Sequence, residues 1–297
     1  MKKIAYFSYK GGAGRSSLAY NTIPLLAESL GATPEHPMII IDLDIDSAGL
    51  TFLLGCHNKQ DLYSTQDVVS GAIPGMTVDA DSVPLKNHPF FSQLIPVGNK
   101  FGLRGEEKDA SILFVPVKTG GNVSFDGTYD QAENYLYNVA KLCNRYGCKA
   151  LILDTPTGDQ LTAKWALDVS KDILVTMKIT YQFRHGTIDF LRRKDRDFAN
   201  KNFILVPNCV PTETIYVDGN AYNYEAVRQE IINTAKDTII NNRVNVEMLE
   251  NGCFGVPEVK RFKLKEGILY TLENLTDDEK AAYEMYGKVT SILVRDN

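Results

Sequence analysis

The residues of this chain with the clearest chemical pattern form a glycine-rich segment near the amino terminus. In order, they are Ser8, Tyr9, Lys10, Gly11, Gly12, Ala13, Gly14, Arg15, Ser16 and Ser17. Repeated glycines let a backbone curl so that several N–H groups point at one anion. A helix that begins directly after such a loop adds the positive end of its dipole. The segment therefore predicts a phosphate-binding loop, in which the hydroxyl of Ser16 stands where it would bind Mg²⁺.

Three alternating acids follow the apolar run Met38–Ile41. If the strand continues through Asp42, Asp44 and Asp46, its period of two places their carboxylates on one side. Like charges gathered in this way repel each other unless a cation or ordered water lies among them. Open α/β sheets bind their ligands at the carboxyl ends of strands, which is where these acids stand.

A further apolar run, Leu151–Leu153, ends in Asp154. A carboxylate at the end of such a strand holds Mg²⁺ through water in many phosphoryl-transfer enzymes. Thr157 and Gly158 follow, and they are candidates for contacts with a terminal phosphate and for a mobile switch segment.

Short apolar runs alternate with helical patterns along the chain. The expected strands are Ile4–Ser8, Met38–Ile41, Ile112–Val117, Ala150–Leu153, Ile173–Met177 and Phe203–Val206. The expected helices are Ser16–Leu30, Tyr129–Tyr146, Thr162–Ser170, Thr180–Lys194 and Tyr224–Ile240. This alternation indicates an α/β fold with a doubly wound, mostly parallel sheet flanked by helices.

The length of 297 residues fits one large α/β domain. The segment Cys56–Lys108 contains four prolines and is expected to be an irregular insertion in that domain. A last helix is expected at Thr276–Val294, because Thr276 and Glu279 form a capping-box pattern. The acidic start of this helix favours docking on the core over a membrane surface, which would need a basic polar face.

The composition excludes several other classes of protein. The formal net charge is −5, with 44% hydrophobic and 23% charged residues, as in a folded globular protein and not in a polycation or disordered chain. The five cysteines include no Cys-x-x-Cys pair, which argues against a disulfide framework, a zinc ribbon and an iron–sulfur site. No apolar stretch of about 18 residues occurs, and the apolar start is too short for a signal peptide, so a cytoplasmic protein without a membrane segment is expected.

Two basic clusters leave two interpretations open. One contains Arg192 and Arg193, and the other contains Lys260, Arg261 and Lys263. Each cluster is either a solvated surface or a nonspecific contact for the phosphates of DNA, which a dimer would double.

The glycine-rich loop departs from the common pattern Gly-x-x-x-x-Gly-Lys-[Ser/Thr], because Arg15 replaces the lysine and Lys10 stands at the start of the loop. With that one change, the segment Lys10–Ser16 resembles the deviant Walker A motif of the ParA/MinD family of P-loop ATPases. The resemblance implies that Lys10 reaches across a dimer interface to the ATP of its partner, in an ATP-sandwich homodimer. Arg15 keeps the charge but not the shape of lysine, so we expect ATP binding to survive and hydrolysis to be slow or altered.

The acids fit the same resemblance. Asp42 and Asp44 match the Asp-x-Asp of the family's first switch, which implies that Asp44 orients the attacking water and that Asp42 supports the hydration of Mg²⁺. Asp154 matches the acid of the second switch and completes a metal site with Ser16 and Asp42. Lys10, Arg15 and Asp44 are therefore the expected catalytic residues.

The nucleotide base has its own expected site. Asn208 ends an apolar run and resembles the family's base-recognition residue, whose amide matches the donor and acceptor of the adenine edge. The segment Gly255–Val259 resembles the loop that closes over the base. The expected nucleotide-binding residues are Gly11, Gly12, Ala13, Gly14, Arg15, Ser16, Ser17, Asn208, Pro257 and Val259.

The resemblance covers residues 1 to about 270. It implies an ATPase that binds ATP and Mg²⁺, dimerises with the nucleotide, and serves plasmid or chromosome partitioning or the positioning of another cargo through an adaptor protein. The alternative is a regulatory switch with weak or no hydrolysis that recruits a protein, which Arg15 and the acidic net charge favour. A metabolic enzyme such as an ATP-dependent ligase of similar fold has less support, because no substrate-site motif is visible.

Overall fold

The structure is a computed structural model. It describes residues 1–58, 62–73, 83–119, 129–193, 201–211, 215–221, 229, 231, 233, 245–248, 255–264 and 266–295. The helix expected at Tyr224–Ile240 lies almost entirely outside these residues.

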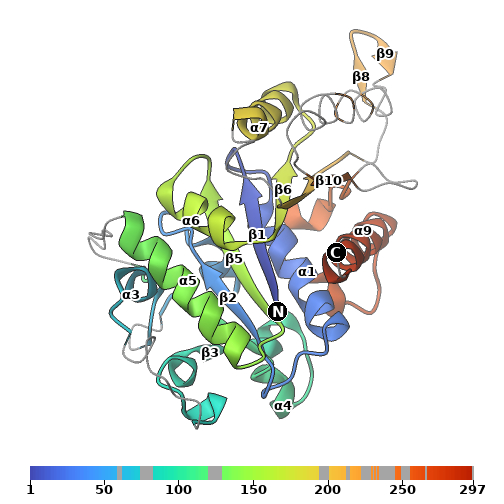
Figure 1. The fold of residues 1–297 in the computed structure, drawn as a ribbon. Coiled ribbons are helices and arrows are strands. Elements are labelled where there is room, and N and C mark those ends of the chain that lie inside the picture. Colours follow the sequence, from blue (N-terminus) through green and yellow to red (C-terminus); the bar gives the residue numbers. More distant parts are fainter. Residues whose placement is uncertain are drawn as a thin grey trace.

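The centre of the described fold is an eight-stranded sheet with the order β10-β7-β6-β1-β5-β2-β4-β3 (Figure 1). Its strands are β1 (Lys2–Ser8), β2 (Met38–Asp42), β3 (Ile95–Pro96), β4 (Ile112–Val115), β5 (Ala150–Thr157), β6 (Asp172–Met177), β7 (Asn202–Pro207) and β10 (Asn245–Met248). Neighbouring strands are parallel, except that the short edge strand β3 runs antiparallel to β4. A separate two-stranded hairpin consists of β8 (Tyr216–Val217) and β9 (Asn220–Ala221).

Helices cover both faces of this sheet (Figure 1). They are α1 (Arg15–Ser29), α2 (Gly49–Leu53), α3 (Thr65–Ser70), α4 (Glu106–Asp109), α5 (Tyr129–Arg145), α6 (Leu161–Val169), α7 (Tyr181–Arg193) and α9 (Asp277–Val294). Short 3₁₀ segments are Leu85–Asn87, Phe91–Gln93, Gly98–Phe101, Lys260–Lys263 and Leu269–Thr271. The doubly wound, mostly parallel sheet of a single domain that the sequence predicts is therefore confirmed.

Strand β1 shows why the sheet has two buried faces. Its residues Ile4, Ala5, Tyr6 and Phe7 are all 0% exposed. Ile4 and Tyr6 belong to the hydrophobic cluster that includes residues of α1 and α9, whereas Ala5 and Phe7 belong to the cluster that includes residues of α5 and α6. A strand with helices on both sides needs apolar residues at every position, which is the pattern of its sequence.

The position of β1 fixes where a ligand can bind. It pairs with β5 on one side and β6 on the other, and β2 lies beyond β5. The loops that leave the carboxyl ends of β1, β2 and β5 therefore emerge next to one another near the middle of the sheet. Ligands of open α/β sheets bind at such a place.

The segment Cys56–Lys108 contains only short elements in its described part, among them α3 and the edge strand β3. At the other end of the chain, α9 packs against α1 (Figure 1). The Thr276 N–H donates to the Glu279 carboxylate at 2.9 Å, as the capping-box pattern predicts. Among the described residues, no helix has both the length and the apolar character that crossing a membrane requires.

Candidate phosphate-binding site

The glycine-rich loop joins β1 to α1 and adopts a backbone that favours glycine. Gly12 has φ of 75° and Gly14, the N-cap of α1, has φ of 78°. A Cβ atom at Gly14 would also lie only 2.3 Å from Nδ2 of Asn208. The free N–H groups at the start of α1 thus face the loop without a large side chain among them, as anion binding requires.

The loop borders a cavity of about 390 Å³. The cavity is lined by Ser8, Gly11, Gly12, Ala13, Gly14, Arg15, Ser16, Ser17, Asp44, Asp46, Ser47, Gly49, Leu53, Thr157, Gln160 and Glu266. The structure thus brings together the loop, the segment after β2 and the end of β5, three parts that lie far apart in the sequence.

Arg15 forms the centre of this site, and its side chain is only 6% exposed. Its Nε donates to Oδ1 of Asp154 at 2.7 Å, and its Nη2 donates to Oδ2 of Asp44 at 2.5 Å. One guanidinium from the loop therefore holds an acid of β5 and an acid from the segment after β2. Charge-assisted bonds of this kind in a buried place are strong and geometrically specific.

Two hydroxyl groups also donate to the carboxylates of Asp154 and Asp44. Ser16 Oγ donates to Oδ2 of Asp154 at 3.1 Å, so both oxygens of that carboxylate have protein donors. Ser47 Oγ donates to Oδ2 of Asp44 at 2.5 Å. Burial raises the pKa of Asp154 above its usual range although Arg15 beside it acts in the opposite direction.

The carboxylate of Asp42 has other partners than that of Asp44. Strand β2 ends at Asp42, so the three alternating acids do not continue on one side of a strand as expected. Asp42 is 0% exposed, and its Oδ2 accepts from the N–H and the hydroxyl of Thr51 at 2.9 and 2.7 Å. Burial first, and then the charge of Asp154, raises its pKa to about 7. Its carboxyl group thus anchors the start of α2 and does not line the cavity.

As they stand, these residues do not fit a bound Mg²⁺ ion. A hydroxyl from Ser16 and a carboxylate from Asp154 are the hard oxygen donors that Mg²⁺ prefers. The guanidinium of Arg15 lies among them, however, and donates to the same carboxylate. No group of three His, Cys, Asp or Glu side chains in the described part of the chain could hold a metal ion.

Lys10 lies at the start of the loop and beside α7 of its own chain. A Cβ atom on Gly186 would be 3.4 Å from Cε of Lys10. The role across a dimer interface that the resemblance implies for Lys10 stays a prediction.

The side chain of Asn208 binds the backbone of the glycine-rich loop. It is 5% exposed, and its Nδ2 donates to the carbonyls of Ala13 and Gly14 at 2.9 and 3.2 Å. The amide that was expected to meet adenine is thus directed at the loop, and Asn208 does not line the cavity. Base recognition by Asn208 stays a prediction that would require this contact to be shared.

The segment after β7 lies beside the one expected to close over the base. Pro257 forms a parallel bridge with Val210, and the Val256 N–H donates to the carbonyl of Pro207 at 2.8 Å. Val259 is 5% exposed and, like Pro257, does not line the cavity. Their contact with a base stays a prediction.

Glu266, Gln160 and Gly49 are among the cavity residues that the sequence did not identify. The Glu266 carboxylate accepts from Ser17 Oγ at 2.7 Å, although about 250 positions separate the two. Gln160 Nε2 lies 3.5 Å from the Asp46 carboxylate. A Cβ atom at Gly49 would be 2.8 Å from Ser16 Oγ. Glu266 and Gln160 carry no motif, whereas a glycine three positions after Asp46 is a usable signal.

The two basic clusters differ in what the structure shows. Arg192 and Arg193 belong to the last turn of α7, and their side chains lie outside the described part. In the other cluster, Arg261 Nε lies 2.9 Å from the Glu279 carboxylate and Lys263 Nζ lies 3.1 Å from that of Glu258. Arg261 and Lys263 are thus paired with acids of the same chain.

Solved structures with the same architecture match the whole chain. A ParA family ATPase from Chlorobium tepidum has a TM-score of 0.63 at 11% identity, over 98% of this chain and 99% of that chain. McdA from Cyanothece, a variant in complex with ATP, gives 0.62 at 13% identity, over 99% and 96%. MinD from Pyrococcus horikoshii with Mg-ADP gives 0.58 at 15% identity, over 99% and 96%. The chain has the fold of the ParA and MinD ATPases.

No family model matches the sequence, and the comparison with curated proteins found no relative. The ParA/MinD fold is thus shown by structure, at identities too low for sequence comparison to detect. It confirms the predicted fold class, and the similar structures with ATP and with Mg-ADP support nucleotide binding in this fold.

Proposed function

We propose that this chain is a cytoplasmic ATPase of the ParA/MinD kind, which binds ATP at Lys10–Ser17 and dimerises with the nucleotide. The observation that carries the proposal is the loop itself. Gly12 and Gly14 hold it in a left-handed conformation that favours glycine, at the N-terminus of α1 and on a cavity of about 390 Å³. Such a loop directs backbone N–H groups at phosphate oxygens.

The charge of the cavity supports a second copy as part of the site. Asp44, Asp46 and Glu266 line it, and Arg15 is the basic residue among its described lining. A triphosphate placed there is repelled unless further positive charge arrives. Lys10 of a partner chain would supply that charge.

Apolar side chains beside the cavity support the same arrangement. Phe52 is 53% exposed and follows Thr51 in α2, next to the cavity residue Leu53. Leu161 is 48% exposed and follows the cavity residue Gln160. A partner packed over the cavity would remove this apolar surface from water, which favours association.

The bridge made by Arg15 offers a route from the nucleotide to two segments. Phosphate oxygens that draw the guanidinium toward the loop would release Asp44 and Asp154 together. The segment after β2 and the end of β5 would then change their contacts in response to one event. Asp44, once released, is placed to orient an attacking water.

Two cellular roles are compatible with ATP-dependent dimerisation. Partitioning of DNA or positioning of a cargo needs a basic surface or an adaptor protein. The alternative, a nucleotide-dependent switch that recruits a protein and hydrolyses ATP weakly, has support from two observations. Arg15 neutralises the proposed catalytic acid Asp44, and Arg261 and Lys263 are paired with carboxylates.

The test is ATP turnover together with ATP-dependent retention of DNA on a filter. We expect slow turnover in the unmodified chain and a further loss of at least about tenfold in Asp44→Asn, because the amide orients water poorly. Asp277→Asn is the matched control, since Asp277 is exposed at the start of α9 and should leave turnover unchanged.

The outcomes separate the candidates. DNA retained only with ATP would support the partitioning output, and no retention with ATP turnover present would support the protein-recruiting switch. Turnover that is absent under all conditions, or equal in Asp44→Asn and the unmodified chain, would contradict the role given to Asp44.

A further inference from the structure

The guanidinium of Arg15 binds Asp154, one of the three residues at which the sequence predicts a divalent cation. It donates to Oδ1 of Asp154 at 2.7 Å while Ser16 Oγ donates to Oδ2 of the same carboxylate at 3.1 Å. Its other end donates to Asp44 at 2.5 Å. Asp154, one of the three residues predicted to hold Mg²⁺, therefore binds a positive side chain of the chain itself, and so does Asp44.

Burial strengthens the electrostatic interactions between Arg15 and the two acids. The side chains of Arg15, Asp44 and Asp154 are 6%, 7% and 0% exposed. Charges in such surroundings are poorly screened by water and salt, so each acid depends on its partner for neutralisation. A divalent cation that entered here would have to displace the guanidinium or be repelled by it.

The third nitrogen of the guanidinium indicates where the Arg15 side chain can move. Nη1 is buried and has no hydrogen-bond partner within the described structure. A buried donor without an acceptor is unfavourable, and a ligand that supplied an acceptor would remove that cost. Arg15 lines the cavity under the phosphate loop, so a phosphate oxygen is the acceptor that the proposed function supplies.

We infer that Arg15 is the built-in counter-ion of Asp44 and Asp154 in the nucleotide-free protein, and that it keeps divalent cations out of the position beside Ser16. A phosphate oxygen that attracted the guanidinium would free Asp44 and Asp154, and the Asp154 carboxylate and the Ser16 hydroxyl would then be open to a cation. The second half of this inference rests on the proposed function, whereas the first half concerns the free protein alone.

The experiment measures the binding of Mn²⁺ to the nucleotide-free chain by electron paramagnetic resonance at pH 8. Mn²⁺ accepts the same oxygen ligands as Mg²⁺ and its free form gives a direct signal. We expect Arg15→Gln to bind one Mn²⁺ at least about tenfold more tightly than the unmodified chain, because two buried carboxylates lose their counter-ion. Arg15→Lys keeps the positive charge and should stay within about threefold of the unmodified chain.

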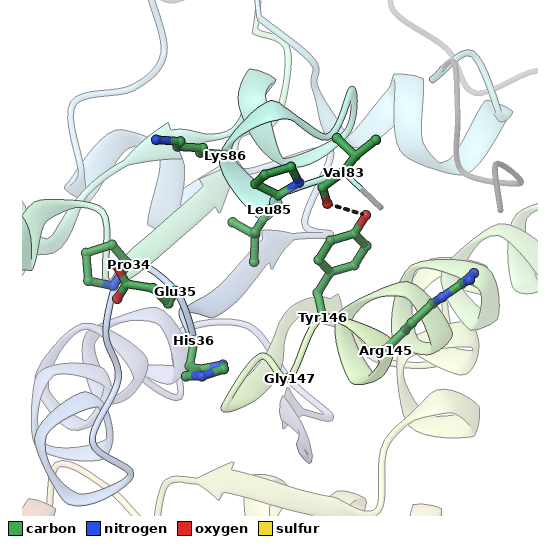
Figure 2. A pocket seen from close by; sticks show the side chains of 10 residues that line it. Pro34, Glu35, His36, Val83, Leu85, Lys86, Arg145, Tyr146 and Gly147 are labelled. Carbon is green, nitrogen blue, oxygen red and sulfur yellow. Dashed lines mark hydrogen bonds between the residues drawn. The ribbon is translucent and has the colours of Figure 1, made fainter. Parts of the chain in front are cut away.

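The matched control is Arg145→Gln. Figure 2 shows Arg145 at a second cavity of about 640 Å³, beside Tyr146 and Gly147, at the end of α5. This cavity lies next to the amino ends of β2 and β5, since His36 and Gly147 line it and those strands begin at Met38 and Ala150. Mn²⁺ affinity in this variant should equal that of the unmodified chain.

A second readout protects the test against a variant that folds poorly. Mn²⁺ should raise the unfolding midpoint of Arg15→Gln and leave that of the unmodified chain unchanged. Equal Mn²⁺ affinity in the unmodified chain and Arg15→Gln would overturn the inference, as would Arg15→Lys binding Mn²⁺ as tightly as Arg15→Gln. A fluorescent ATP analogue added to the unmodified chain tests the proposed function separately, because failure to bind it would leave the Mn²⁺ result in place.

Discussion

At the scale of single residues, neighbouring acids in this chain have separate tasks. Asp42 and Asp44 are two positions apart, yet one is anchored to Thr51 and the other to Arg15. The sequence identified both as functional candidates. It did not predict that their side chains have different partners, because it considered a strand that continues to Asp46, whereas β2 ends at Asp42. Partners from other elements, Arg15 of α1 and Thr51 of α2, decided the outcome.

The raised pKa of Asp42 has a consequence for stability. Since its pKa is about 7 in the folded chain and near 4 when unfolded, the folded state binds the extra proton between those values. Its contribution to stability is therefore present below about pH 4 and is lost as the pH rises toward 7, with a slope of at most about 1.4 kcal/mol per pH unit. We expect urea unfolding to show a flatter stability profile between pH 5 and 7 in Asp42→Asn than in the unmodified chain, and identical slopes would contradict this account.

At the scale of elements, the turn between β1 and α1 depends on Gly14 for two reasons. Its φ of 78° is unfavourable for other residues, and a Cβ atom there would meet Asn208 at 2.3 Å. We expect Gly14→Ala to lower the free energy of unfolding by about 1–3 kcal/mol from strain alone and to weaken ATP binding at least tenfold.

Gly31 provides the control for this variant. It lies just after the other end of α1 with φ of 62°, and a Cβ atom there would meet nothing within 4 Å. Gly31→Ala should therefore lose about 1 kcal/mol of stability from strain and keep its ATP affinity. Denaturant unfolding and ATP titration measure both quantities, and equal ATP affinities in the two variants would rule out a special role for the loop.

Elements were predicted well where one local signal was enough. The apolar runs gave β1, β2, β4, β5, β6 and β7, and the glycine before α1 marked its start within one residue. Strand β5 continues to Thr157, four residues beyond the expected end, because pairing with β1 extends it through polar residues. The contacts of Asn208 and Glu266 with the loop could not be predicted, since they join segments about 195 and 250 positions apart.

At the scale of the whole molecule, the proposed function places the nucleotide site between two chains. The chain shares its architecture with ParA, MinD and McdA structures along nearly its whole length. Its cavity carries more acids than bases and lies beside exposed Phe52 and Leu161. A second copy whose Lys10 contacts a triphosphate in the loop would balance the acidic charge of the cavity and cover the exposed apolar side chains.

Sedimentation velocity with a fluorescent ATP analogue tests this claim most directly, because it reports bound nucleotide and particle mass in one run. The account predicts that the unmodified chain sediments as a dimer carrying the analogue. Lys10→Ala should carry the analogue as a monomer, while the control Lys86→Ala behaves like the unmodified chain. Analogue that fails to sediment with the protein, or a Lys10→Ala chain that dimerises as readily as the unmodified one, would contradict the account.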